Sequence, residues 1–168
     1  FQDYGLFPWL TVEENIRFGL DARGFKGDKQ KIVADLVALT RLQGFERSRP
    51  SQCSGGMAQR VALARALANQ VEILLMDEPF GALDAFTRME LQEEIVRIVK
   101  AQGVTTIFVT HDIDEALYVG DRVAIMSAHP GELRGVIPVP IEHPRDRIDP
   151  QLVRLRQEVF AEFNLAHT

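Results

Sequence analysis

Two adjacent carboxylates, Asp77 and Glu78, stand at the end of the apolar run Ile73-Leu-Leu-Met-Asp-Glu-Pro79. Such a run is typical of a buried parallel strand, and ligands of open α/β sheets bind at the carboxyl ends of their strands. Asp77 is suited to hold Mg²⁺, mainly through water, and Glu78 to orient or deprotonate an attacking water. A solvated acidic turn after a core strand is the alternative interpretation.

A second candidate site precedes an alanine-rich stretch, where Ser54 is followed by Gly55 and Gly56. Backbone amides at a helix N-terminus, beside a hydroxyl and without bulky side chains, form an anion site. An ordinary Ser-capped helix with a glycine turn explains the same residues.

His111 closes the apolar stretch Ile107-Phe-Val-Thr-His. A histidine at the end of a strand can hydrogen-bond a terminal phosphate. A structural or solvent-facing histidine is the competing interpretation.

The order of helices and strands explains how these side chains would be positioned. Capping signals at Thr11 with Glu14, at Asp84 with Gly103, and at Asp112 with Glu115 mark helix ends. Helices are expected over about 11–20, 32–44, 54–68, 84–103, a short stretch after 112, and 152–163, and buried strands over 71–76, 105–110, 122–127 and 135–139. Helices alone precede residue 70, and strands alternate with helices after it, which predicts a parallel sheet with crossover helices and an inserted helical lobe.

Composition narrows the class of protein. The 168 residues are 46% hydrophobic and 26% charged with a net charge of −5, as in a soluble globular protein. The sequence contains no cluster of Lys and Arg residues of the kind that binds nucleic acid. No apolar run approaches the roughly 20 residues of a membrane span. Cys53 is the single cysteine, so no internal disulfide is possible.

Taken together, five segments in one order resemble the ABC transporter ATPase family, and the resemblance covers essentially the whole chain. The segments are Gln2 at the Q-loop, CSGGMAQRVALARAL (53–67) at the signature motif, ILLMDEP (73–79) at Walker B, GALD (81–84) at the D-loop and VTHD (109–112) at the switch histidine.

The resemblance implies roles for single residues. Gln2 is similar to the glutamine that senses Mg²⁺ and the terminal phosphate and couples to the membrane subunit. The signature residues Ser54, Gly55, Gly56 and Met57 resemble those that contact ATP held by the other subunit. Two positions depart from the family pattern: Cys53 stands where Leu is usual, and Met57 where Gln is usual.

The remaining roles concern catalysis and the dimer interface. Asp77 resembles the aspartate that organises Mg²⁺, Glu78 the catalytic base, and His111 the histidine that touches the γ-phosphate. Asp84 resembles the D-loop aspartate at the dimer interface.

One expected motif is absent from the sequence. No G-x-x-x-x-G-K-[ST] occurs, and none of the four lysines has the right neighbours. That loop cradles the phosphates and supplies a Mg²⁺ ligand. In the family it lies upstream of the Q-loop, so we expect that the natural chain begins earlier and that this chain is inactive alone.

The sequence therefore predicts the C-terminal part of an α/β P-loop ATPase core joined to a helical signature-motif subdomain. We expect residues 1–70 to hold the Q-loop and helical subdomain, 71–140 the ATPase core, and 141–168 a tail and helix. The resemblance implies ATP and Mg²⁺ as cofactors and a head-to-tail ATPase dimer. It also implies a permease partner at the cytoplasmic face of the membrane, an external substrate-binding protein acting indirectly, and no nucleic acid.

Two segments outside the shared motifs resemble importers of nitrate, sulfonates or taurine. One is Phe7-Pro8-Trp9 with Thr11-Val12 and Asn15-Ile16, and the other is the tail with His129-Pro-Gly131, Val139-Pro140 and His143-Pro-Arg-Asp146. A thiamine-precursor pyrimidine is the alternative cargo. A non-transport ABC-type ATPase and a binding fragment without turnover are the alternative classes.

Overall fold

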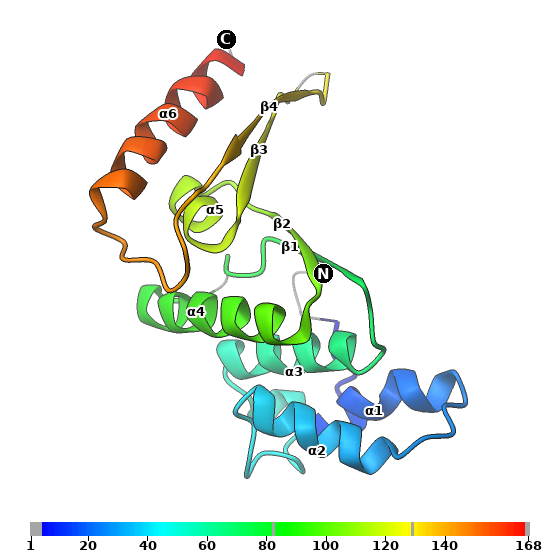
Figure 1. Cartoon of the computed structure of the whole chain (residues 1–168). Coiled ribbons are helices and arrows are strands. Elements are labelled where there is room, and N and C mark those ends of the chain that lie inside the picture. The colour runs from blue at the N-terminus through cyan, green and yellow to red at the C-terminus, as the bar shows by residue number, and fades with distance from the viewer. Residues whose placement is uncertain (1–4, 82, 129, 167–168) are drawn as a thin grey trace. The chain divides into compact units, whose positions relative to one another are not determined.

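A computed structural model of the chain describes residues 5–81, 83–128 and 130–166. The chain forms two compact units, residues 1–107 and 108–168. The first contains α1 (Val12–Ala22), α2 (Lys29–Leu39), a short 3₁₀ turn (Pro50–Gln52), α3 (Gly55–Leu67), β1 (Ile73–Asp77) and α4 (Ala85–Gln102). β2 (Thr105–Val109) crosses the boundary, and the second unit contains α5 (Ile113–Val119), β3 (Arg122–Met126), β4 (Leu133–Pro138) and α6 (Pro150–Ala166) (Figure 1).

The predicted capping box opens α1. The Thr11 amide donates to the Glu14 carboxylate at 2.7 Å, and the Glu14 amide donates to the Thr11 hydroxyl at 3.3 Å. These hydrogen bonds hold the pKa of Glu14 below its usual value. The buried face of α1 carries Val12, Ile16 and Leu20, and α1 packs against α3.

Helix α2 ends earlier than the sequence predicts. It stops at Leu39 rather than near Gly44, because Arg41 adopts a left-handed φ of 53° that a helix cannot continue through. Its buried face is Val33, Leu36 and Val37.

The segment β1–α4–β2 is the expected parallel β-α-β unit, in which β1 and β2 pair and α4 is the crossover helix. Asp84 caps α4, and Gly103 ends it with a φ of 62°, both as predicted. Leu91, Ile95 and Ile98 form its buried face.

The prediction that these two strands are buried on both faces is wrong. In β1, Leu74 and Met76 are buried, whereas the side chains of Ile73 and Leu75 are 59% and 71% exposed. Ile107 and Val109 of β2 are also exposed. Each strand is therefore covered on one face only by the described residues.

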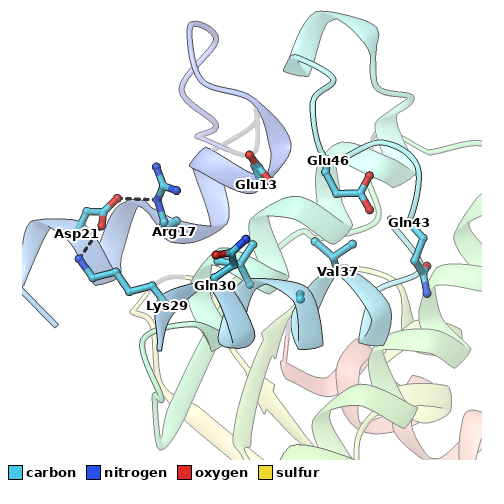
Figure 2. A pocket seen from close by; sticks show the side chains of 10 residues that line it. Glu13, Arg17, Asp21, Lys29, Gln30, Val37, Gln43 and Glu46 are labelled. Atoms are coloured by element: carbon cyan, nitrogen blue, oxygen red, sulfur yellow. Dashed lines mark hydrogen bonds and ion pairs between the residues drawn. The ribbon is translucent and has the colours of Figure 1, made fainter. Parts of the chain in front are cut away.

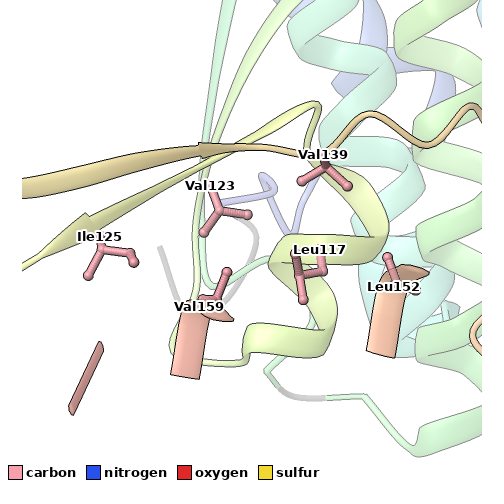
Figure 3. Close-up of a cluster of buried hydrophobic side chains, with 6 residues drawn as sticks. All are labelled: Leu117, Val123, Ile125, Val139, Leu152 and Val159. Atoms are coloured by element: carbon pink, nitrogen blue, oxygen red, sulfur yellow. The ribbon is translucent and has the colours of Figure 1, made fainter. Parts of the chain in front are cut away.

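In the second unit, β3 and β4 form an antiparallel pair, with Ala124 opposite Val136. The sequence predicts only parallel strands, and for this pair the prediction is wrong. β3 ends at Met126 and β4 begins at Leu133, a separation too short for the crossover connection that parallel strands need. The buried core of this unit consists of Leu117, Val123, Ile125, Val139, Leu152 and Val159 (Figure 3).

A buried arginine ties the tail to α5. The Arg145 side chain donates from Nη1 to the carbonyls of Leu117 (2.7 Å), Tyr118 (3.1 Å) and Gly120 (2.8 Å), and from Nε to that of Ile141 (2.8 Å). Burial lowers the pKa of its guanidinium. These bonds satisfy carbonyls at the end of α5 that no helical amide reaches.

The division into functional segments 1–70, 71–140 and 141–168 stays a prediction. Over the described ranges, no helix is long and apolar enough to cross a membrane.

Candidate functional site

Asp77 and Glu78 lie at the end of β1 and are exposed. Glu78 has a φ of 45°, a left-handed conformation that is strained in a residue other than glycine. The turn closes when the Gly81 amide donates to the Glu78 carbonyl at 3.2 Å, and Phe80 anchors it as a fully buried side chain. The chain thus changes direction at Glu78, next to the carboxylate of Asp77.

The signature residues form the start of α3. Ser54 is the N-cap, and its hydroxyl accepts a hydrogen bond from the Met57 amide at 3.3 Å. Gly55, Gly56 and Met57 make up the first turn, which contains no acidic residue. The first amides of a helix have no partners within it and carry its positive dipole end, so this turn is suited to an anion.

Gly56 lets α3 approach α4 closely. A Cβ at this position would lie 2.8 Å from Cγ2 of Thr87, too close for any real side chain. The hydroxyl of Thr87 donates in turn to Oδ2 of Asp84 at 2.6 Å. The start of the signature helix and the start of α4 are therefore in direct contact within the first unit (Figure 1).

Both carboxylate oxygens of Asp84 accept hydrogen bonds at the start of α4. Its Oδ1 accepts from the amides of Phe86 and Thr87, each at 3.1 Å. The hydrogen bonds from Thr87 hold the pKa of the Asp84 carboxyl below its usual value. The carboxylate is exposed, so the cap leaves it on the surface.

His111 belongs to the second unit and is exposed. It directly precedes Asp112, which caps α5 by accepting from the amides of Asp114 and Glu115. The Thr110 hydroxyl donates to Glu115 at 2.7 Å, which fixes the chain on the other side of the histidine. Gln2, the remaining predicted site residue, lies outside the described residues.

The metal hypothesis depends on Asp77. No group of three His, Cys, Asp or Glu side chains close enough to hold an ion is found among the described residues. The chain thus offers an exposed carboxylate rather than a closed cage. That donor set fits Mg²⁺, which takes one or two carboxylates and completes its shell with water and nucleotide phosphates.

Glu94 is not among the residues predicted from the sequence to matter for the site. This carboxylate lies on the buried face of α4, with its side chain 3% exposed, and forms an ion pair with Arg60 Nε of α3 at 2.7 Å. The available signal was its spacing of three from Leu91 and four from Ile98, which places an acid on an apolar face.

A cavity of about 500 Å³ lies between α1 and α2 (Figure 2). Val33 and Val37 supply apolar wall, and Asp21 pairs with Arg17 (2.9 Å) and Lys29 (2.8 Å) at one end. The other lining residues are Glu13, Gln30, Ala34, Gln43 and Glu46.

Comparisons with known proteins agree with these motifs. The family model described as ABC transporter matches residues 1–81. The aliphatic sulfonates import ATP-binding protein SsuB of Bacillus subtilis is 49% identical over 97% of this chain and 63% of its own length. SsuB 1 of Pseudomonas savastanoi pv. phaseolicola is 47% identical over 99% of this chain and 69% of its own length. The chain thus spans less than two thirds of the Bacillus relative.

Solved structures give the same assignment for the fold. The ATP-binding cassette MJ0796, in a dimeric post-hydrolysis state bound to ADP and Pi, superposes with a TM-score of 0.68. It is 32% identical, and the match covers 84% of this chain and 62% of that one. The predicted fold class, the C-terminal part of an α/β P-loop ATPase core with a helical subdomain, is confirmed. The chain belongs to the ABC transporter ATPase family.

Proposed function

We propose that this chain belongs to the ATP-hydrolysing subunit of an ABC importer that takes up a small anion, most specifically an aliphatic sulfonate. The observation that carries the proposal is the similarity of nearly the whole chain to sulfonate import ATP-binding proteins from two distant bacteria. The described signature, Walker B and D-loop segments support it, since each has local geometry suited to its role.

In this proposal Glu78 is the general base for the attacking water, and Asp77 holds Mg²⁺ together with the nucleotide phosphates. Mg²⁺ supplies charge neutralisation at the β- and γ-phosphate oxygens when bound. The exposed position of both carboxylates leaves them accessible to a nucleotide. His111 donates a hydrogen bond to the γ-phosphate, and Gln2 links the metal site to the membrane subunit.

Ser54, Gly55, Gly56 and Met57 serve the nucleotide held by a second subunit. Two features support this arrangement: Ser54 and Gly55 are exposed, and they lie at the positive end of α3. Asp84, exposed beside them at the start of α4, lies at the dimer interface in the proposal. The dimeric structure of the MJ0796 cassette is consistent with it.

The permease partner would bind the helical part of the first unit, on the cytoplasmic face of the membrane. Trp9 is 66% exposed and Phe18 42%, and both rings lie tilted against that of Phe7, with centroid distances of 5.6 and 4.3 Å. Exposed aromatic side chains are typical anchors of protein interfaces. The nearby cavity between α1 and α2 offers a mixed polar and apolar groove to the same partner. An external substrate-binding protein would act through the permease.

The test uses a joined cassette, in which the upstream segment of the Bacillus subtilis relative precedes this chain. We expect the joined cassette to hydrolyse Mg-ATP with release of phosphate, and the 168-residue chain alone to bind ATP weakly by calorimetry and not to turn it over. A folded joined cassette that binds ATP without turnover would favour a pure binding role and contradict the proposal.

A further inference from the structure

Glu94 lies among three arginines from different parts of the first unit. Arg60 Nε on α3 is 2.7 Å from one carboxylate oxygen, and Arg41 and Arg97 each lie 3.9 Å from the other. Arg97 also donates to the Leu39 carbonyl at 2.7 Å, so part of its hydrogen-bonding capacity is used at the end of α2. The close partner of Glu94 is therefore Arg60.

This pair joins the two helices that carry the dimer-facing residues. Arg60 follows Ser54 by six residues on α3, about 9 Å along the axis. Glu94 follows Asp84 by ten residues on α4, about 15 Å along the axis. The helix starts meet a second time where Gly56 contacts Thr87. Two contacts at different positions along the helices oppose independent sliding or rotation of α3 on α4.

A buried ion pair stabilises helix packing less effectively than apolar side chains do. Removing two charges from water costs free energy that apolar side chains of the same volume do not incur. A contact of 2.7 Å between opposite charges, however, is lost if either helix slides. The ion pair therefore favours one register of α3 on α4 through charge attraction, although the contact is not aligned as a hydrogen bond.

We propose that Glu94 is a positioning residue that locks the signature helix α3 to the D-loop helix α4, so that Ser54 and Asp84 are presented to the partner subunit as one rigid surface. The inference rests on the proposed function, because it assumes that Ser54 serves a nucleotide held by the partner. Glu94 itself touches no nucleotide.

The test is a mixed dimer of two differently tagged joined cassettes with a single active site. One subunit carries Glu78→Gln, which silences the ATP site that it holds itself, but its signature helix still serves the active site of the other subunit. Glu94→Gln is then placed either in the silenced subunit or in the active one. Saturating Mg-ATP turnover is measured for both arrangements.

We expect Glu94→Gln in the silenced subunit to lower turnover roughly two- to thirtyfold, and the same change in the active subunit to leave turnover nearly unchanged. A merely stabilising role would lower both arrangements alike. Arg60→Lys, which keeps the charge but loses the Nε contact, should give the same asymmetry and serves if Glu94→Gln does not fold. Glu90→Gln is the matched control, because Glu90 is an exposed acid on the same helix.

Ser54→Arg in the same two arrangements separates the inference from the proposed function. If Ser54→Arg is asymmetric but Glu94→Gln and Arg60→Lys are not, the positioning role is wrong and the composite site stands. If Ser54→Arg shows no asymmetry, the composite site fails and the inference fails with it.

Discussion

At the scale of single residues, Glu78 is distinctive because its backbone is strained. Its φ of 45° belongs to a region that non-glycine residues enter at a cost of about 1–2 kcal/mol. The backbone turns at this residue, directly after Asp77 ends the strand. Strain of this kind is frequent where a side chain must be aimed at a ligand.

We predict that Glu78→Gln in the joined cassette lowers turnover about 10²- to 10⁴-fold, because the amide keeps the shape of the side chain but cannot accept the proton of the attacking water. ATP binding should be retained, and ATP should hold the dimer closed. Phosphate release and size-exclusion chromatography with ATP measure the two effects. Near-normal turnover would show that another group is the base.

Gly56 provides a second prediction, about packing. Gly56→Ala should destabilise the joined cassette by roughly 1–3 kcal/mol in urea unfolding, because its Cβ would lie 2.8 Å from the methyl of Thr87. Adding Thr87→Ser removes that methyl and keeps the hydroxyl bonded to Asp84, so it should restore much of the loss.

Gly135→Ala is the control for this change, because a Cβ there meets no atom within 4 Å. If Thr87→Ser fails to rescue Gly56→Ala, the close approach of α3 and α4 is not the cause of the destabilisation.

The sequence correctly predicted helix caps among the candidate residues, because that information is local. Ser54, Asp84 and Asp112 all cap the helices expected of them, because a cap depends on a few neighbouring residues. It missed Glu94 and its pairing with Arg60, since the partners are 34 positions apart and no local rule reports such a contact.

At the scale of helices and strands, the sequence-based predictions failed at one helix end and at one strand pairing. The end of α2 depends on the single left-handed residue Arg41, and no glycine or proline at that position signals it in the sequence. The antiparallel pairing of β3 and β4 follows from the short separation between Met126, which ends one strand, and Leu133, which begins the other. Alternation of helices and strands predicts parallel strands only where a crossover helix lies between them, as α4 does between β1 and β2.

Arg145 organises the element that follows His111. We predict that Arg145→Met destabilises the second unit by roughly 2–4 kcal/mol, because it leaves several carbonyls without donors in a buried place. Hydrogen exchange of the α5 amides should accelerate, and Arg145→Lys should retain part of the protection through its remaining charge and donors.

Arg154→Met is the matched control, since Arg154 is an exposed arginine of the same unit. Equal exchange rates of α5 in the Arg145→Met and Arg154→Met variants would contradict the clamp.

At the scale of the whole molecule, one face of the β1–β2 sheet is exposed although its residues are apolar. Ile73, Leu75, Ile107 and Val109 are exposed, although they belong to apolar runs that predict buried strands. An apolar pattern indicates that a face of a strand can be buried, but it does not indicate which segment buries it. The family assignment could be predicted from sequence because it depends on the order of five motifs, whereas the cover of this face could not.

In the proposed importer the ATPase motifs do not touch the transported molecule, so the cargo would be decided outside this chain. We predict that deleting the gene in its host impairs growth when an alkanesulfonate is the only sulfur source. The similarity to sulfonate import proteins over 97% and 99% of the chain motivates this choice over the other anions. Uptake of labelled sulfonate measures the effect directly.

Parallel cultures limited for nitrate, taurine or a thiamine-precursor pyrimidine test the neighbouring assignments, and the deleted gene supplied on a plasmid is the positive control. A Glu78→Gln copy on the same plasmid should fail to restore uptake, because transport requires turnover rather than the presence of the subunit. Unimpaired uptake of all four solutes, together with lost uptake of a sugar, peptide or metal, would exclude the anion assignment and leave the ATPase proposal intact. If the Glu78→Gln copy restores uptake, import does not depend on hydrolysis at this site.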